Sequence, residues 1–254
     1  MLIILSPAKT MQETETKVVA HTTVPGFLDK TALLAKALKQ FSVSELAAVM
    51  KINVQLAQLN YGRFQQWETA RHAKEGVPAL LSYQGEVFRG LDAVSWDAGD
   101  FRFAQKHLRI LSGFYGVLRP LDRVLPYRLE MGGGFAPEGF RNLYAFWKQT
   151  VTEAVRTALA EQGDQVLVNL ASNEYFKSLD KKILNVQVVT PVFLEARGNG
   201  FKMVTVYAKK ARGMMARFIV QNRLSRSNDL KRFEEAGYFF NEALSKGGEW
   251  VFTR

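Results

Sequence analysis

The sequence predicts a mixed α/β fold of the α+β type, a single compact domain over residues 1–254 with a central β-sheet surrounded by helices. Short apolar or β-branched stretches, typical of buried strands, lie near both ends of the chain, whereas the segments between them space apolar residues as helices do. The sheet must therefore be assembled from segments that are distant in sequence. The 254 residues contain no linker rich in Ser, Pro or Gly, and this length is sufficient for one large core.

The first expected strand is the apolar run at residues 2–5. Pro7 ends it, because proline has no N–H group with which to continue a ladder of hydrogen bonds. Ser6 and Lys9 are therefore expected at the carboxyl end of a strand.

The middle of the chain is predicted to be helical. Apolar residues at helical spacing from Thr31 to Arg71 indicate two or three consecutive helices. Residues 79–91 and 101–111 carry mixed signals and are interpreted as helical, and a longer helix is expected from Leu143 to Leu159.

The pattern then changes to strands. The expected strands are residues 166–170, 186–193, 202–207 and 250–252. Arg197-Gly198-Asn199-Gly200 is a strong turn sequence, so the two strands that flank it should pair as an antiparallel hairpin.

The segment from Tyr207 to Arg232 contains eight Lys or Arg residues and one acid. If it begins as a helix, one face is positive and the opposite face is apolar. The positive face comprises Lys209, Lys210, Arg212, Arg217 and Arg223. Gly213 falls within this face, where the missing side chain would let a phosphate approach the backbone. Such a charge density favours an anionic partner, although a solvated basic helix gives the same pattern.

A second basic group lies between Lys106 and Met131. It comprises Arg109, Arg119 and Arg128, together with Gly113 and Gly116. The arginine forks and exposed glycine N–H groups suit a phosphate. The alternative is a packed turn in which Asp122 and Glu130 satisfy Arg119 and Arg128.

Polar residues follow the expected strand 166–170, in the sequence from Asn169 to Lys177. Glu174, Tyr175 and Lys177 are candidate acid or base groups at the end of a buried strand. The alternative is that Ser172 or Asn173 caps a following helix.

The helical segment from Ser44 to Trp67 is interrupted by Lys51-Ile52-Asn53, where Asn53 should end one helix and cap the next. Two short helices joined in this way can bind DNA phosphate, with Lys51, Arg63 and Arg71 adding charge. The alternative is a helical hairpin that only packs in the core.

Several classes of function are excluded or disfavoured by residue inventory. The chain has no cysteine and only three scattered histidines, so neither a metal site nor a cofactor is expected. No GxSxG, GxxxxGK or GxGxxG motif occurs. No signal peptide or membrane-spanning run is visible, so an unexported protein without a membrane partner is expected. The net charge of +10 favours nucleic acid or a small anion.

Five motifs together resemble the bacterial peroxide stress protein YaaA family. They are LSPAK at 5–9, LSGFYGVLRPLD at 111–122, PYRLEMG at 126–132, NLAS at 169–172 and YAKKARG at 207–213. The resemblance extends over the whole chain, and the motifs are long and unusual.

The resemblance implies a cytoplasmic protein that limits oxidative damage during hydrogen peroxide stress by keeping free intracellular iron low. It also implies binding of double-stranded DNA through a positively charged cleft and a helix-hairpin-helix element. That element maps onto Ser44 to Trp67, although Lys51-Ile52-Asn53 replaces the usual Gly-hydrophobic-Gly hairpin. Without cysteine or paired histidine, the effect on iron is expected to be indirect, through protection or repair of DNA.

Two hypotheses follow. The first is a non-catalytic protein that binds double-stranded DNA, independently of sequence, through phosphate contacts. Its expected contacts are Lys51, Arg63, Arg109, Arg119, Arg128, Lys209, Lys210, Arg212 and Arg217. The alternative is an enzyme that acts on a phosphorylated or carboxylated small molecule with Lys9, Arg119, Glu174, Tyr175 and Lys209. An enclosed cavity at which Ser6, Lys9 and Lys209 converge would favour the alternative.

Overall fold

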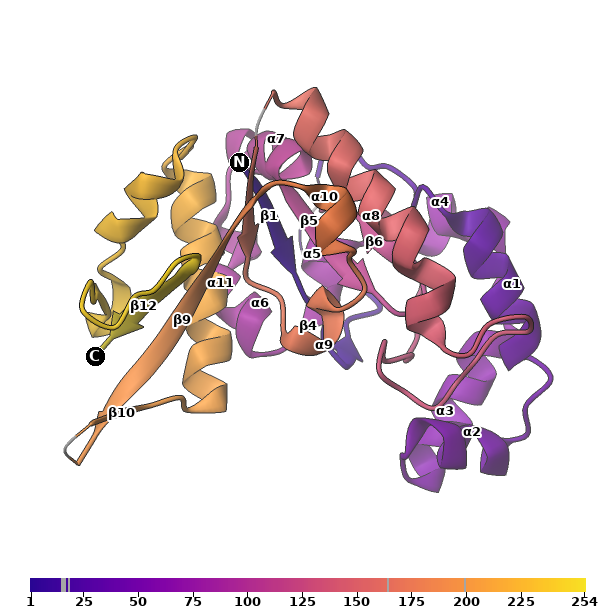
Figure 1. Cartoon of the computed structure of the whole chain (residues 1–254). Coiled ribbons are helices and arrows are strands. Elements are labelled where there is room, and N and C mark those ends of the chain that lie inside the picture. Colours follow the sequence, from indigo (N-terminus) through magenta and orange to yellow (C-terminus); the bar gives the residue numbers. More distant parts are fainter. Residues whose placement is uncertain (15–16, 18, 164, 199) are drawn as a thin grey trace.

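The computed structural model describes residues 1–14, 17, 19–163, 165–198 and 200–254, and it is organised around a mixed eight-stranded sheet (Figure 1). Seven strands follow the order β11-β12-β9-β8-β1-β5-β6, and β10 pairs with β9. The strands are β1 (Leu2–Leu5), β5 (Leu108–Ser112), β6 (Gly116–Leu118), β8 (Val166–Asn169), β9 (Gln187–Arg197), β10 (Gly200–Lys202), β11 (Phe239–Phe240) and β12 (Glu249–Thr253). The chain thus has the mixed α/β fold that the sequence predicts.

The five central strands, from β12 to β5, are parallel, whereas β6, β10 and β11 pair antiparallel at the margins. β1 lies between β5 and β8, with Ile4 opposite Arg109 on one side and Asn169 on the other. Two small ribbons accompany the sheet. They are β2 (Thr10–Met11) with β4 (Tyr83–Gln84), and β3 (Val77–Pro78) with β7 (Arg123–Val124).

Helices flank the sheet, and α1, α2 and α3 lie at the side near α8, away from β9 and β12 (Figure 1). The α-helices are α1 (Leu28–Leu38), α2 (Val43–Met50), α3 (Val54–Gln65), α4 (His72–Glu75), α5 (Ala79–Ser82), α6 (Glu86–Leu91), α7 (Ala98–His107), α8 (Leu143–Glu161), α9 (Asn173–Phe176), α10 (Lys181–Leu184) and α11 (Thr205–Gln221). Short 3-10 helices occur at Thr69–Arg71, Ala93–Ser95, Ser227–Arg232 and Glu235–Gly237.

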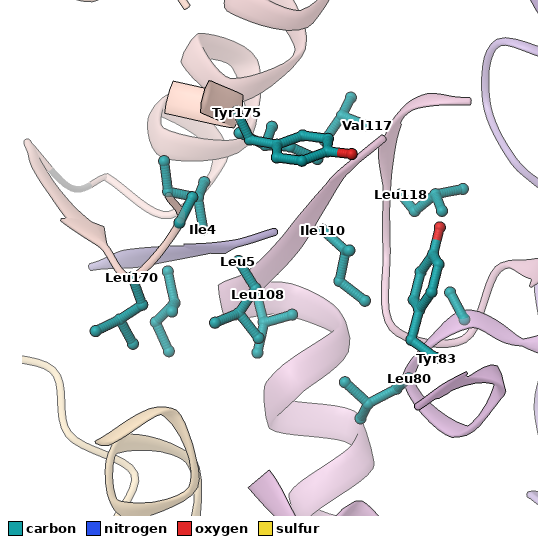
Figure 2. Close-up of a cluster of buried hydrophobic side chains, with 14 of the residues drawn as sticks. Ile4, Leu5, Leu80, Tyr83, Leu108, Ile110, Val117, Leu118, Leu170 and Tyr175 are labelled. Carbon is teal, nitrogen blue, oxygen red and sulfur yellow. The ribbon is translucent and has the colours of Figure 1, made fainter. Parts of the chain in front are cut away.

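The core is densest around β1, whose four residues are completely buried. Both faces of a central parallel strand are covered, which is why this strand reads as an unbroken apolar run. Figure 2 shows Ile4 and Ile110 among side chains from distant segments, including Leu80, Leu118 and Leu170. The core therefore fixes the position of the strand ends at which the polar residues lie.

The structure corrects two predicted elements. Residues 108–111, interpreted as helical, belong to β5, because their buried side chains pair beside β1 in the middle of the sheet. The strand expected at 202–207 ends at Lys202, and α11 begins at Thr205. β10 is exposed along its length, so no packed face extends that strand. The predicted hairpin is present as β9 and β10, although Asn199 of its turn lies outside the described residues.

The two short helices expected from Ser44 to Trp67 are α2 and α3, joined by Lys51-Ile52-Asn53. Lys51 takes the left-handed conformation, with φ of 52°, that glycine usually supplies at a helix end. The Ile52 N–H bonds back to the Ala47 carbonyl at 3.1 Å, which closes the end of α2. Asn53 caps α3 as predicted, because its side chain accepts a hydrogen bond from the Leu56 N–H at 2.9 Å.

Gly213 is not placed to admit a phosphate. A Cβ at this position would lie 1.8 Å from the Val87 carbonyl oxygen of α6. Gly90 of α6 meets α11 in the same way, 2.1 Å from the Lys210 carbonyl oxygen. The two glycines therefore serve the close approach of two helix backbones, which corrects the interpretation based on the helical arc.

Candidate functional site

A cavity of about 370 Å³ opens at the carboxyl ends of β1 and β8. Its wall is formed by the loop after β1, by α6, by residues 127–130, by the turn between β8 and α9, and by α11. Neighbouring parallel strands bring their carboxyl ends to the same edge of a sheet, where ligands of α/β proteins commonly bind. The cavity thus collects polar residues from both ends of the chain.

A serine pair joins the two strand ends. The Ser6 hydroxyl donates to the Ser172 hydroxyl at 3.2 Å and accepts the Ser172 N–H at 2.8 Å. Ser172 occupies the position before α9, as the capping alternative expects, but its side chain makes no capping hydrogen bond there. The Ser172 hydroxyl instead accepts a hydrogen bond from Ser6, the residue after β1, so this pair fixes the two strand ends relative to each other.

Three of the residues that line the cavity form an ionic triad. Glu130 Oε2 pairs with Lys9 Nζ at 3.1 Å, and Glu130 Oε1 accepts a hydrogen bond from Arg128 at 2.9 Å. Lys9 and Arg128 therefore already have a carboxylate partner. This pairing of Arg128 agrees with the packed-turn alternative.

Glu174 and Tyr175 stand on α9 at the cavity wall. Glu174 Oε1 accepts the Gly132 N–H at 2.9 Å, whereas Oε2 receives no hydrogen bond from the residues that the structure describes. Burial raises the pKa of the Tyr175 phenol, and the nearby carboxylate of Glu174 adds to that rise. Tyr175 therefore remains a neutral hydrogen-bond donor, and Glu174 Oε2 is a free acceptor.

Lys209 and Arg212 line the cavity from α11. Lys209 is exposed, whereas Arg212 is largely covered, and burial lowers the pKa of its guanidinium. Within the described parts of the chain, neither side chain has a carboxylate partner or a hydrogen bond. The cavity therefore holds a partly desolvated cation, Arg212, that forms no ion pair with a described residue.

Three of the predicted phosphate-binding arginines lie elsewhere or are already paired. Arg109 donates to the Gln105 carbonyl at 3.0 Å, at the end of α7, and does not line the cavity. Arg119 is held by Asp122, with its Nη2 2.9 Å from Oδ1, and it too lies outside the cavity. Arg63 pairs with Glu13 at 2.6 Å. Arg109, Arg119 and Arg128 therefore do not form a single group.

The basic residues of the predicted positive face of α11 have different surroundings in the structure. Arg217 pairs with Glu235 at 2.6 Å, and Arg223 pairs with Asp100 at 2.6 Å beyond the end of the helix. Lys210 is exposed and lies outside the cavity. Only Lys209 and Arg212 of the predicted face are brought to the cavity.

A wider depression of about 640 Å³ adjoins the cavity and shares Lys9, Arg128, Glu130 and Glu174 with it. Lys51 and Lys177 line it and are exposed. No acid pairs with either lysine among the described residues. The helical hairpin thus contributes to this depression through Lys51.

Sequence reasoning missed the apolar wall of the cavity. Val87 and Phe88 come from α6, Leu170 from the end of β8 and Tyr127 from the loop after β7. These residues look like ordinary core residues, so the only signal was the position of Leu170 beside the predicted polar cluster.

No group of three or more His, Asp or Glu side chains in the described ranges is arranged to hold a metal ion. Among the same residues, no helix combines the length and apolar character that crossing a membrane requires.

Comparison with known proteins identifies the family. The sequence profile of the family described as peroxide stress protein YaaA matches residues 1–244. The chain belongs to this family. Two curated relatives are UPF0246 proteins, one from Saccharophagus degradans at 46% identity and one from Colwellia psychrerythraea at 45%. Each match covers all of this chain and 99% of the relative. Membership supports a role in peroxide stress, as the resemblance implies.

Proposed function

We propose that the cavity binds a small anionic molecule, phosphorylated or carboxylated, and that this binding serves the role in peroxide stress. The observation that carries the proposal is Arg212, a largely covered guanidinium without a described acidic partner. An uncompensated charge removed from water is costly, so proteins retain one mainly where a ligand supplies the counter-charge. Lys209 adds a second free cation at the same wall.

The other polar groups suit a reaction on such a ligand. Glu174 Oε2 is free to accept a proton, and Tyr175 stays protonated and able to donate a hydrogen bond. Lys9 is held by Glu130, so its role is to orient that carboxylate. Arg119, proposed for this enzyme from the sequence, lies outside the cavity and is left out.

Inorganic phosphate tests the proposal. At ten times the dissociation constant and fixed ionic strength, phosphate should stabilise the protein by about 1.4 kcal/mol and raise Tm by about 3 to 5 °C. Arg212→Gln should weaken binding by at least about tenfold, because one charge-assisted contact is worth about 1.5–3 kcal/mol. Its Tm without phosphate should not fall, since the variant removes an unbalanced charge.

Lys36→Gln is the matched control, because Lys36 is an exposed lysine on α1 and does not line the cavity. It should respond to phosphate as the wild type does. An equal response of Arg212→Gln and the wild type would contradict the proposal.

A second candidate function is binding of double-stranded DNA, favoured by one observation. Lys51 and Lys177 line the depression beside the cavity, Lys209 lines the cavity and Lys210 lies nearby on α11, and all four are exposed. With Arg212 they offer about five phosphate contacts, so the logarithm of affinity should fall with the logarithm of salt at a slope of about −4 to −5. Affinity that stays flat between low and physiological salt would exclude this candidate.

In either case we place the protein in the cytoplasm and treat any effect on free iron as indirect. The described residues offer no carboxylate or histidine cluster that would sequester iron. A DNA-binding protein of this kind would act by shielding the duplex from iron-dependent damage.

A further inference from the structure

We infer that the ligand of the cavity is a single nucleotide unit, with its phosphate at Arg212 and Lys209 and its base against the apolar wall. The inference rests on the proposed function, and it specifies the class of anion. It is carried by the size of the cavity, by the charged and apolar residues that line it, and by the unpaired lysines among the described residues next to it.

The volume of the cavity, about 370 Å³, lies in the range of small-ligand sites and is too large for phosphate alone. Its accessible apolar wall comes from Pro7, Ala8 and Val87, whereas Phe88, Tyr127 and Leu170 also line the cavity but are at most 8% exposed. A flat, weakly solvated ring gains from contact with such a wall, and a nucleobase has that shape. A simple phosphate or small carboxylate would leave this wall in contact with water.

The cavity presents unpaired positive charge and an unpaired acceptor on two different helices. Arg212 and Lys209 supply unpaired positive charge on α11. Glu174 Oε2 supplies an unpaired acceptor on α9, while its Oε1 is held by the Gly132 N–H at 2.9 Å. Carboxylates accept hydrogen bonds from the exocyclic amine of cytosine, and a similar bond is available to adenine. We therefore expect bases that carry an exocyclic amine to bind more tightly than thymine.

Lysines without an acidic partner among the described residues also lie outside the cavity. Lys51 and Lys177 line the adjoining depression, and Lys210 lies one residue beyond Lys209 on α11. A nucleotide inside a DNA strand has a phosphate on each side, and these exposed lysines are the cations available near the cavity to contact such phosphates. The same chemistry therefore has two sources, a free nucleotide or a nucleotide turned out of a strand.

The first arm of the experiment titrates the full chain with inorganic phosphate, dCMP and dTMP at constant ionic strength. We expect dCMP to bind about 5- to 150-fold more tightly than phosphate, which is the gain that stacking of one base supplies. Glu174→Gln should reduce the preference for dCMP over dTMP, and it should not weaken phosphate binding, because it removes a negative charge from the cavity. Arg212→Gln should weaken all three ligands, and Lys209→Gln serves the same purpose if that variant is unstable.

The second arm uses a duplex that carries 2-aminopurine opposite an abasic site. The fluorescence of this base rises several-fold when it leaves the stack, so a rise on saturation with protein indicates that the base is unstacked, and dependence of the rise on Arg212 connects it with the cavity. The rise should disappear in Arg212→Gln and persist in Lys36→Gln.

The outcomes separate this inference from the proposed function. A preference for dCMP over phosphate supports a free nucleotide, and a fluorescence rise that depends on Arg212 supports a nucleotide within a strand. If phosphate binding requires Arg212 but dCMP is not preferred and the fluorescence does not rise, the nucleotide inference is overturned and the proposed anion site stands. If neither phosphate nor a nucleotide binds in the first arm and the fluorescence does not rise in the second, both the nucleotide inference and the proposed anion site are overturned.

Discussion

Substituting Gly213 with alanine distinguishes the packing role of this glycine from the phosphate-binding role that the helical pattern suggested. The new Cβ would lie 1.8 Å from the Val87 carbonyl oxygen and 2.7 Å from the Leu91 nitrogen. Both are backbone atoms of α6, so no side chain can rotate away. Reaching the 3.0 Å that real Cβ atoms keep requires the two helices to separate by roughly 1 Å.

The expected net effect follows from two opposed terms. Alanine in a helix interior gains about 1 kcal/mol over glycine, whereas forced separation of packed backbones costs about 3 kcal/mol, at the upper end of the overpacking range. We therefore expect Gly213→Ala to lose about 2 kcal/mol and to lower Tm by about 4 to 8 °C. Because α6 and α11 both line the cavity, phosphate affinity should fall as well.

Gly62→Ala is the matched control, since Gly62 lies inside α3 and a Cβ there meets nothing within 4 Å. This variant should gain about 1 kcal/mol from helix propensity alone. Thermal unfolding followed by circular dichroism measures both variants. A Gly213→Ala protein that is as stable as the wild type, or more stable, would refute the packing argument and restore the exposed-backbone interpretation.

Three further predictions concern the buried network and the metal content. Burial lowers the pKa of His72 and of His107, so below about pH 6.5 the unfolded chain binds protons that the folded protein does not, and the protein should become less stable as the pH is lowered. Urea unfolding midpoints at pH 7.5 and pH 5.5 measure this loss of stability. His72→Gln should lose less stability between these two pH values than the wild type does. Tyr115→Phe removes the hydroxyl that accepts the Leu125 N–H at 3.1 Å, and it should lower the free energy of unfolding by about 1–3 kcal/mol. The control Tyr61→Phe should change the free energy of unfolding by less than about 0.5 kcal/mol. Equal effects of the two variants would contradict the role of the Tyr115 hydroxyl. Elemental analysis of the purified protein should find no stoichiometric iron or zinc, and one tightly held metal ion per chain would show that the residue inventory misleads.

Local features of the sequence predicted much of the fold correctly. The apolar run at 2–5 is β1, the cap at Asn53 separates α2 from α3, and the β-branched stretches at 166–170 and 186–193 correspond to β8 and β9. These elements depend on contacts within a few residues or on burial that a short pattern records. β5 was mistaken for helix because its strand character depends on β1, which lies about a hundred residues away.

The candidate site shows the same division. The position of Ser6 and Lys9 at a strand end, and of Glu174 after another, followed from sequence, because a strand end is a local feature. The apolar wall at Val87 and Phe88 did not, because nothing local distinguishes a side chain that faces a cavity from one that faces the core.

The sequence by itself determined the positive charge of α11, the absence of cysteine and the family to which the chain belongs. Only the tertiary structure decided which of these charges is free. Arg217 meets Glu235 from a later turn, whereas Arg212, five residues earlier on the same helix, meets no acid in the described structure. The physical reason is that pairing and desolvation depend on groups that distant segments bring within a few ångströms, and helical periodicity contains no information about them.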